Sequence, residues 1–182
     1  MKKVAIAVSI AALFGAVNMA NAASNGTITF SGELTDNTCD VRVNNQNVDG
    51  TVTLPTISIN ELNNAGSTSG LTGFTVELEN CRGTLLNGAS VFFQAGGGVD
   101  QDSGRLNNIG GSAGNVQLQL RDGSNPSQTV IRAGDTSQVL ETTYVDISSD
   151  HAILPYLVEY YATNPTTPGT VITSAVYSIQ YR

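Results

Sequence analysis

The segment Thr27-Ile28-Thr29-Phe30-Ser31-Gly32-Glu33-Leu34-Thr35 alternates between apolar and polar positions close to the start of a 182-residue chain. Side chains of a β-strand point to opposite faces in turn, so this alternation predicts a strand with one apolar face. That face would carry Ile28, Phe30, Gly32 and Leu34. Segments so near a terminus are usually frayed and polar unless something holds them. Two interpretations follow: an ordinary first strand that pairs within its own domain, or a strand that leaves the domain and pairs with a neighbour.

Residues 1–22, which precede this segment, have the pattern of a secretory signal peptide. Lys2 and Lys3 give a positive start, residues 4–17 are almost entirely apolar, and Ala20-Asn21-Ala22 has the small-x-small pattern that a signal peptidase recognises. We therefore expect cleavage between Ala22 and Ala23 and export of the mature protein. The apolar stretch is shorter than the roughly 20 residues of a transmembrane helix, so we expect no membrane insertion after processing.

The rest of the chain has the pattern of short strands separated by Gly, Asn and Pro turns. Alternation marks residues 51–54, 74–79, 116–120 and 175–181, and a short apolar run covers residues 91–93. Residues 153–162 are apolar on both faces, which predicts a strand covered on both sides. No stretch has a convincing helical period, and we find no internal repeat or linker. The pattern predicts an all-β fold, a β-sandwich.

The composition argues against several kinds of partner. Charged residues make up 13% of the chain, against the roughly 25% that is usual in soluble domains. The 15 acidic residues outnumber the 8 basic ones, which gives a net charge of −7. An acidic chain of this kind is a poor ligand for nucleic acid or for an anionic membrane. We expect neither as a partner.

Both cysteines, Cys39 and Cys81, lie in the expected mature chain. Export takes them to an oxidising compartment, where a disulfide is the usual state of such a pair. The alternatives are two free thiols or half of a metal site. A zinc site needs four ligands, and His151 is the only histidine, so we expect the disulfide.

Three motifs suggest catalysis or metal binding at first sight. Residues 110–114, Gly-Gly-Ser-Ala-Gly, match the nucleophile elbow of hydrolases, but that motif needs a helix after the serine, and a strand pattern follows here. His151 is the sole candidate for a histidine general base and reads as a loop residue that enters a strand. Residues 100–104 resemble a calcium loop, yet the remaining ligands are absent, which favours a solvated turn. We expect no enzymatic activity, metal or cofactor.

The chain resembles the pilin subunits of chaperone–usher fimbriae, in particular the type 1 fimbrial major-subunit family. The matching pieces are Gly26 to Leu34, Thr38-Cys39-Asp40-Val41, Phe74 to Cys81, Tyr160-Tyr161-Ala162-Thr163, and the terminal Ala175-x-Tyr177-x-Ile179-x-Tyr181-Arg182 with its penultimate tyrosine. These pieces span nearly the whole mature chain in the family's order. Its length fits a single pilin domain and is too short for a two-domain tip adhesin.

The resemblance implies an incomplete immunoglobulin-like β-sandwich with one disulfide, completed by a donor strand from another subunit. In this family a periplasmic chaperone fills the exposed groove with one of its own strands, and an outer-membrane usher exchanges that strand for the N-terminal extension of the next subunit. The extension would be residues 23–36 and the pilin domain residues 37–182. Its donor residues would be Ile28, Phe30, Gly32 and Leu34. The groove and chaperone-recognition edge would be Ala175, Tyr177, Ile179, Tyr181 and Arg182.

The expected function is therefore a structural subunit of a cell-surface fimbria, exported through the periplasm and joined to neighbouring subunits in a homopolymer. Two alternatives remain open. One is a minor or adaptor pilin with the same assembly chemistry. The other is a self-complete secreted β-sandwich that binds a ligand such as a glycan, and such a module would fold alone as a monomer.

Overall fold

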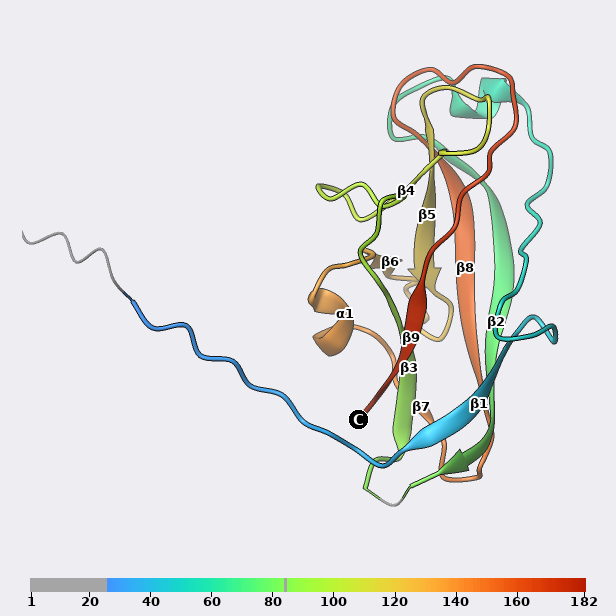
Figure 1. The fold of residues 1–182 in the computed structure, drawn as a ribbon. Helices are drawn as coiled ribbons and strands as arrows, with labels where there is room; N and C mark the ends of the chain where they lie inside the picture. The colour runs from blue at the N-terminus through green and yellow to red at the C-terminus, as the bar shows by residue number, and fades with distance from the viewer. Residues whose placement is uncertain (1–25, 84) are drawn as a thin grey trace, which may run out of the picture. The chain divides into compact units, whose positions relative to one another are not determined.

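The computed structural model of the protein describes residues 26–83 and 85–182 (Figure 1). The expected signal peptide and the cleavage site between Ala22 and Ala23 lie outside the described residues. The chain divides into two units, Met1–Glu33 and Leu34–Arg182. In the first unit, residues 26–33 form neither strand nor helix, although the alternation in this segment predicts a strand.

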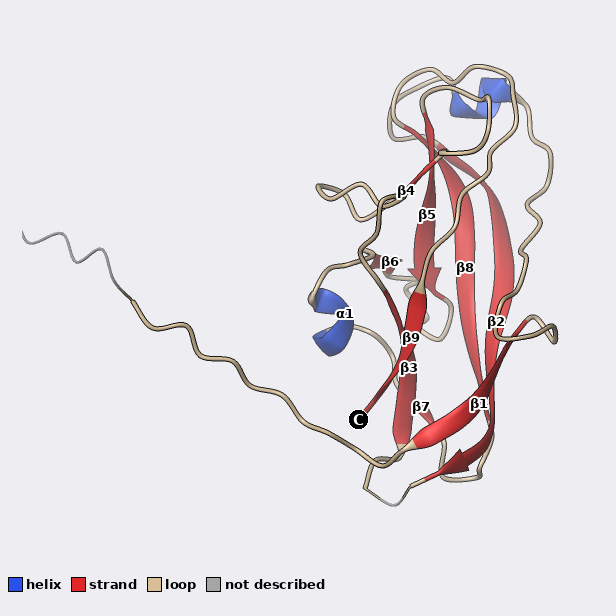
Figure 2. Cartoon of the chain, viewed as in Figure 1, coloured by secondary structure: helices blue, strands red, loops and turns tan. Residues whose placement is uncertain are grey.

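The second unit is built from strands, as the sequence predicts. The strands are β1 (Thr38–Val43), β2 (Thr68–Arg82), β3 (Gly88–Phe93), β4 (Leu106–Asn107), β5 (Val116–Asp122), β6 (Val130–Ile131), β7 (Val145–Asp146), β8 (Ala152–Ala162) and β9 (Tyr177–Tyr181). Helix in the described part of the chain is limited to two single turns, η1 (Ile59–Leu62) and α1 (Ser137–Leu140) (Figure 2). Neither turn is long or apolar enough to span a membrane.

The strands form two antiparallel sheets. The larger sheet has the order β1-β2-β8-β5-β4, with β6 also paired to β5, and the smaller sheet has the order β7-β3-β9. The two longest strands of the larger sheet, β2 and β8, pair from Leu78↔Ala152 to Thr68↔Tyr161, with a break in register between Ser69 and Thr72. The inner faces of both sheets contribute to one hydrophobic core, in which Leu78, Val91 and Leu154 are almost completely buried. This arrangement is a β-sandwich.

One face of β8 lies in the core and the other does not, so the prediction that residues 153–162 are covered on both sides is wrong. Leu154, Tyr156 and Val158 are buried, whereas Ile153 is 50% exposed. The outward residue Glu159 is buried only because polar neighbours surround it. Its carboxylate accepts a hydrogen bond from the Arg121 guanidinium at 2.6 Å and from the Gln119 amide at 2.8 Å.

Residues 51–54 also differ from expectation, because they belong to no strand. Their alternation does appear in the burial: Val52 and Leu54 pack against the core, and Thr51 and Thr53 are exposed. The segment therefore alternates in burial as a strand does, but no described strand pairs with it.

Candidate functional site

In the part of the chain that the structure describes, no strand lies beside the outer edge of β9. β9 pairs only with β3, and the backbone hydrogen bonds of Arg182 to Gly88 and of Val176 to Gln94 show which residues use that shared edge. Backbone groups of successive residues point to opposite edges of a strand, so those of Tyr177, Ile179 and Tyr181 point away from β3. Among the described residues, none pairs with them.

At the opposite edge of the same small sheet, side chains form hydrogen bonds with the strand backbone. Beyond the short β7, side chains take the place of a strand along β3. The Tyr156 hydroxyl accepts the Val91 N–H at 2.9 Å, and the Gln138 amide both accepts from Phe93 N–H at 2.9 Å and donates to its carbonyl at 3.0 Å. Buried backbone groups without partners are costly, and these side chains remove that cost on one edge only.

A second unpaired stretch of backbone faces β9. Within the described residues, no hydrogen bond reaches the backbone N–H or carbonyl groups of residues 52–54. Side chains hold the stretch at both ends. At one end, the Gln46 side-chain amide donates a hydrogen bond to the Thr51 carbonyl and accepts one from the Thr51 N–H, each at 3.1 Å. At the other end, the Tyr160 hydroxyl donates to the Pro55 carbonyl at 3.2 Å.

An apolar groove of about 840 Å³ lies between these two edges. One wall is formed by residues of the 41–54 stretch and the other by residues 173–179. The floor is the core itself, through Phe74, Val76, Phe93, Leu106, Leu118, Leu120 and Val158. An exposed apolar groove with an unpaired backbone edge on each side is the arrangement that accepts an added β-strand.

Tyr177 crosses this groove. Its side chain points inward from β9 and packs against the core, and its hydroxyl donates to the Val48 carbonyl on the other wall at 2.7 Å. Partial burial raises the pKa of the Tyr177 hydroxyl, and the nearby Asp49 carboxylate raises it further, so the hydroxyl keeps its proton at neutral pH.

The other residues expected at the groove edge fall into two groups. Ala175 and Ile179 line the groove together with Tyr177. Tyr181 and Arg182 do not line it: Tyr181 packs against the core, and the Arg182 backbone closes the pairing of β9 with β3 at Gly88. The Arg182 guanidinium lies 5.5 Å from the centre of the Tyr144 ring.

The expected donor residues show no contacts that would bury them. Ile28 and Phe30 are 77% and 88% exposed, and Leu34 is 97% exposed. A Cβ atom added to Gly32 would meet nothing within 4 Å. Three large apolar side chains of this short segment are therefore exposed, whereas the residues that form the floor of the groove are buried.

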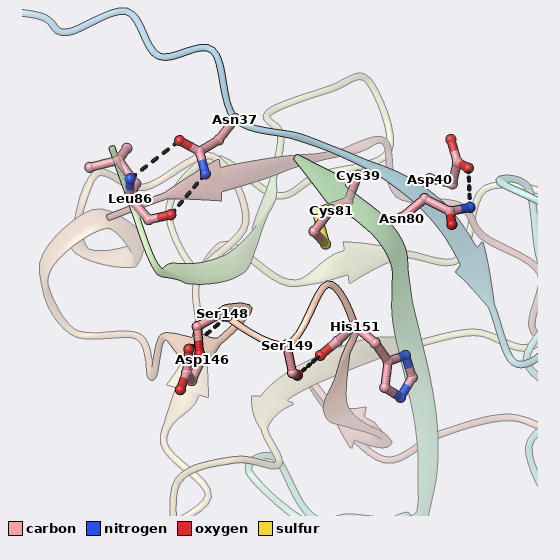
Figure 3. The surroundings of a disulfide bond; sticks show 10 residues. All are labelled: Asn37, Cys39, Asp40, Asn80, Cys81, Leu86, Asp146, Ser148, Ser149 and His151. Carbon is pink, nitrogen blue, oxygen red and sulfur yellow. Dashed lines mark hydrogen bonds between the residues drawn. A yellow bond between two sulfur atoms is a disulfide. The ribbon is translucent and has the colours of Figure 1, made fainter. Parts of the chain in front are cut away.

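The start of the second unit is firmly anchored (Figure 3). Cys39 and Cys81 form a disulfide, which confirms the prediction from the sequence and joins β1 to the end of β2. Just before it, the Asn37 amide donates to the Leu86 carbonyl at 2.8 Å and accepts the Leu86 N–H at 3.3 Å. These contacts anchor the chain at Asn37, immediately before β1.

Two of the three motifs that suggest catalysis or metal binding form hydrogen-bonded loops in the structure. Residues 110–114 form a loop before β5, and the Ser112 N–H is bonded to the Thr170 hydroxyl rather than facing a histidine. Asp100 accepts the N–H and hydroxyl of Ser103, which lowers its pKa and makes a polar turn. In the described ranges no three His, Cys, Asp or Glu side chains are grouped as a metal site requires.

Sequence reasoning missed the wall opposite β9. Residues 48–54 carry no signal that marks them as part of a site, apart from the weak alternation at 51–54. The hydrogen bond between the Tyr177 hydroxyl and the Val48 carbonyl could not be predicted from the sequence either, because the two residues are 129 positions apart.

Comparison with known proteins gives a consistent set of matches. The family model described as "Type-1 fimbrial protein, A" matches residues 54–182. The chain is 37% identical over 172 residues to the major fimbrial subunit SMF-1 of Stenotrophomonas maltophilia, covering 93% of this chain and 99% of that protein. It is 30% identical over 174 residues to the minor fimbrial subunit HifD of Haemophilus influenzae, covering 87% and 75%.

Two solved structures have a similar fold. A type I fimbria protein of Burkholderia pseudomallei aligns with a TM-score of 0.53 at 26% identity, covering 81% of this chain and 97% of that one. The P pilus rod subunit PapA aligns with a TM-score of 0.55 at 16% identity, covering 78% and 99%. At that identity the second likeness bears on the fold alone.

Proposed function

We propose that this chain, which belongs to the type-1 fimbrial protein family and is a structural pilus subunit, polymerises by donor-strand exchange. In this proposal residues 23–36 of one copy enter the groove of the next copy and complete its sandwich. The subunit thereby becomes part of a cell-surface fimbria made of many copies of the chain.

The observation that carries the proposal is the contrast between the two edges of the small sheet. Tyr156 and Gln138 satisfy the backbone of β3 where no strand covers it, whereas the outer edge of β9 and the facing residues 52–54 have no partner among the described residues. A chain that can cap one edge with its own side chains leaves the other open above an apolar groove. A strand from outside would pair with both open edges at once.

Apolar burial and backbone pairing favour an occupied groove, and the ordering of the segment opposes it. Burying three large apolar side chains contributes roughly 1.5–3 kcal/mol each, so Ile28, Phe30 and Leu34 together contribute about 5–9 kcal/mol. Backbone hydrogen bonds along both edges add to this gain. Ordering the segment opposes it by roughly 1–2 kcal/mol per residue. Durability would therefore be partly kinetic, because the strand must peel out of a buried groove before the subunits separate.

Before assembly the same groove needs another occupant, since an open apolar groove with free edges invites aggregation. We assign this role to a strand of a periplasmic chaperone, followed by exchange at an outer-membrane usher. The signal-peptide pattern of residues 1–22 supports transit through the periplasm.

Gel electrophoresis of fimbriae tests the proposal. Subunits joined through a buried strand should give a ladder that resists heat and detergent. Phe30→Asp places a charge on the donor face and should abolish the ladder while leaving capture by the chaperone intact. Ser31→Asp places the same charge on the opposite face and should preserve the ladder. Normal fimbriae from the Phe30→Asp variant would refute donor-strand exchange through this segment.

The relatives include both major and minor subunits. Donor-strand exchange as proposed here would apply to either position in a fimbria. If the chain were instead a self-complete ligand-binding module, we would expect it to fold without a strand from another subunit. A processed chain that stays monomeric, with residues 23–36 dispensable for its stability, would favour that module.

A further inference from the structure

We propose that neighbouring copies also make a direct contact outside the groove, in which Leu85 of one copy packs against a patch formed by Ile109 and Ile172 of the next. The inference rests on the proposed donor-strand exchange and adds an interface between the two sandwiches. It starts from the short connection between the donor segment and the first anchored residue, Asn37.

The connection between donor and sandwich is too short to act as a long flexible linker. Residues 35 and 36 alone separate Leu34, the last apolar donor residue, from Asn37. Three residue steps span at most about 10–11 Å when fully extended. The connection is also bonded internally, because the Thr35 hydroxyl accepts the Asn37 N–H at 3.1 Å and donates to the Asn37 side-chain oxygen at 2.7 Å. A sandwich attached in this way stays next to the copy whose groove holds its Leu34.

Leu85 lies beside this anchor and is 67% exposed. The Asn37 amide holds the backbone of the following residue, Leu86, through hydrogen bonds of 2.8 and 3.3 Å. Gly83 packs against Asn37 so closely that a Cβ atom added to the glycine would lie 2.7 Å from the Asn37 Cα. Leu85 therefore belongs to the part of the sandwich that the connection brings to the neighbouring copy.

The direction of the incoming strand decides which end of the groove receives Leu34. Every strand pair in the described residues is antiparallel, so we place the incoming segment antiparallel to β9. Residues 28–34 equal the groove wall at residues 173–179 in length. Leu34 then falls near Thr173 or Ala175, and this end of the groove is its entrance.

The anchor and the groove entrance of one copy lie at opposite ends of β9. Leu86 stands two residues before Gly88, whose N–H donates at 2.9 Å to the carbonyl of Arg182, just beyond the end of β9. The entrance at residues 173–175 precedes the first residue of β9. The copies therefore stack head to tail, so the contact joins two different surfaces of the chain.

Two exposed isoleucines lie beside the entrance of the receiving copy. Ile172, which precedes Thr173 in the chain, is 57% exposed, and Ile109 is 61% exposed. The Gly110 N–H donates to the Ile172 carbonyl at 3.0 Å, which places the two segments side by side. Covering exposed apolar side chains is favourable. The short connection identifies the occupant, because it brings an exposed leucine of the next copy to this end of the groove.

Chemical cross-linking within assembled fimbriae tests the contact. Leu85→Cys and Ile172→Cys in the same full chain place one thiol on each side of the interface, and the native cysteines are held in their disulfide. A short bismaleimide should join neighbouring copies into a covalent ladder that persists in hot guanidinium chloride, where ladders held by the donor strand alone are lost. Ile109→Cys in place of Ile172→Cys should give the same covalent ladder.

The matched control pairs Leu85→Cys with Leu140→Cys. Leu140 is 82% exposed but belongs to α1, which contacts the C-terminal half of β9 through the hydrogen bond of the Gln180 amide to the Gln138 carbonyl. It is therefore remote from the entrance, and this pair should give no covalent ladder. Adding Ile109→Asp to the Leu85 and Ile172 cysteine pair places a charge in the patch. That change should abolish the covalent ladder and leave the heat- and detergent-resistant ladder intact, because the groove is untouched.

Each outcome decides the question. A covalent ladder from either interface pair and none from the control pair supports the contact. Its absence from both interface pairs, in fimbriae that keep the heat- and detergent-resistant ladder, overturns the contact, and so does an equal covalent ladder from the control pair. Donor-strand exchange is judged separately by Phe30→Asp, which alters neither Leu85 nor the patch.

Discussion

The hydroxyl of Tyr156 in β8 accepts a hydrogen bond from the backbone N–H of Val91 in β3, at 2.9 Å in the middle of the core. The bond joins the two sheets, since β8 belongs to the large sheet and β3 to the small one. Both residues are almost fully buried, so no water can replace the lost partner cheaply. The sandwich therefore depends on a polar contact in its interior to satisfy an edge that lacks a strand.

Tyr156→Phe should lower the free energy of unfolding by about 1–3 kcal/mol, the cost of leaving the buried Val91 N–H without an acceptor. Chemical denaturation of the purified subunit measures this difference. Tyr160→Phe is the matched control, because its hydroxyl bonds the Pro55 carbonyl at the surface, and its loss should cost less. Equal effects of the two substitutions would contradict the role given to Tyr156.

Alkaline pH should destabilise the subunit through the same residue. Burial raises the pKa of Tyr156 above the ordinary value of 10.0, so the folded protein holds a proton that the unfolded chain releases. Stability from this group is complete below pH 10 and falls as pH rises further, by about 1.4 kcal/mol per pH unit. Burial also raises the pKa of Tyr144, Tyr160, Tyr177 and Tyr181, so a shallower decline should remain in Tyr156→Phe. Unfolding curves between pH 8 and about 11 test this, and identical slopes in both proteins would refute it.

The strands could be predicted from the sequence because alternation reports directly on which side chains face a core. The alternation at residues 74–79, 116–120 and 175–181 corresponds to β2, β5 and β9. The short β4, β6 and β7 have two residues each and exist only because a longer strand lies beside them. For residues 153–162 the apolar pattern misled, since the outer face of β8 is covered in part by the ion pair of Glu159 with Arg121 and not by a second layer.

One of the two walls of the groove could be predicted from the sequence for a similar reason. The alternating terminal residues marked one wall of the groove, and the structure places Ala175, Tyr177 and Ile179 along it. Which edges lack a partner depends on contacts between residues far apart in the chain, such as Phe93 with Gln138. No local pattern encodes such an edge, so the facing wall at residues 48–54 had to come from the structure.

The disulfide should be required for a good yield of folded subunit. Cys39 and Cys81 are 42 residues apart, and closing such a loop stabilises the folded state by about 4 kcal/mol in the chain-entropy model. Cys39→Ser should therefore lower the amount of folded protein recovered from the periplasm. The double variant, in which Cys81 is also replaced by Ser, should show the same loss without a free thiol that could cross-link. Wild-type yields from both variants would show that the disulfide contributes little.

The strength of the fimbria should depend on the inward side chains of residues 23–36 according to their apolar area. Phe30→Ala and Ile28→Ala each remove part of a contribution of roughly 1.5–3 kcal/mol per side chain, with the larger loss at Phe30. The temperature at which the detergent-resistant ladder dissociates should fall in that order. Thr29→Ala changes the opposite face of the same segment and should leave the temperature unchanged. If Thr29→Ala weakened the ladder as much as Phe30→Ala, the alternating face of Ile28, Phe30 and Leu34 would not be the surface that enters the groove.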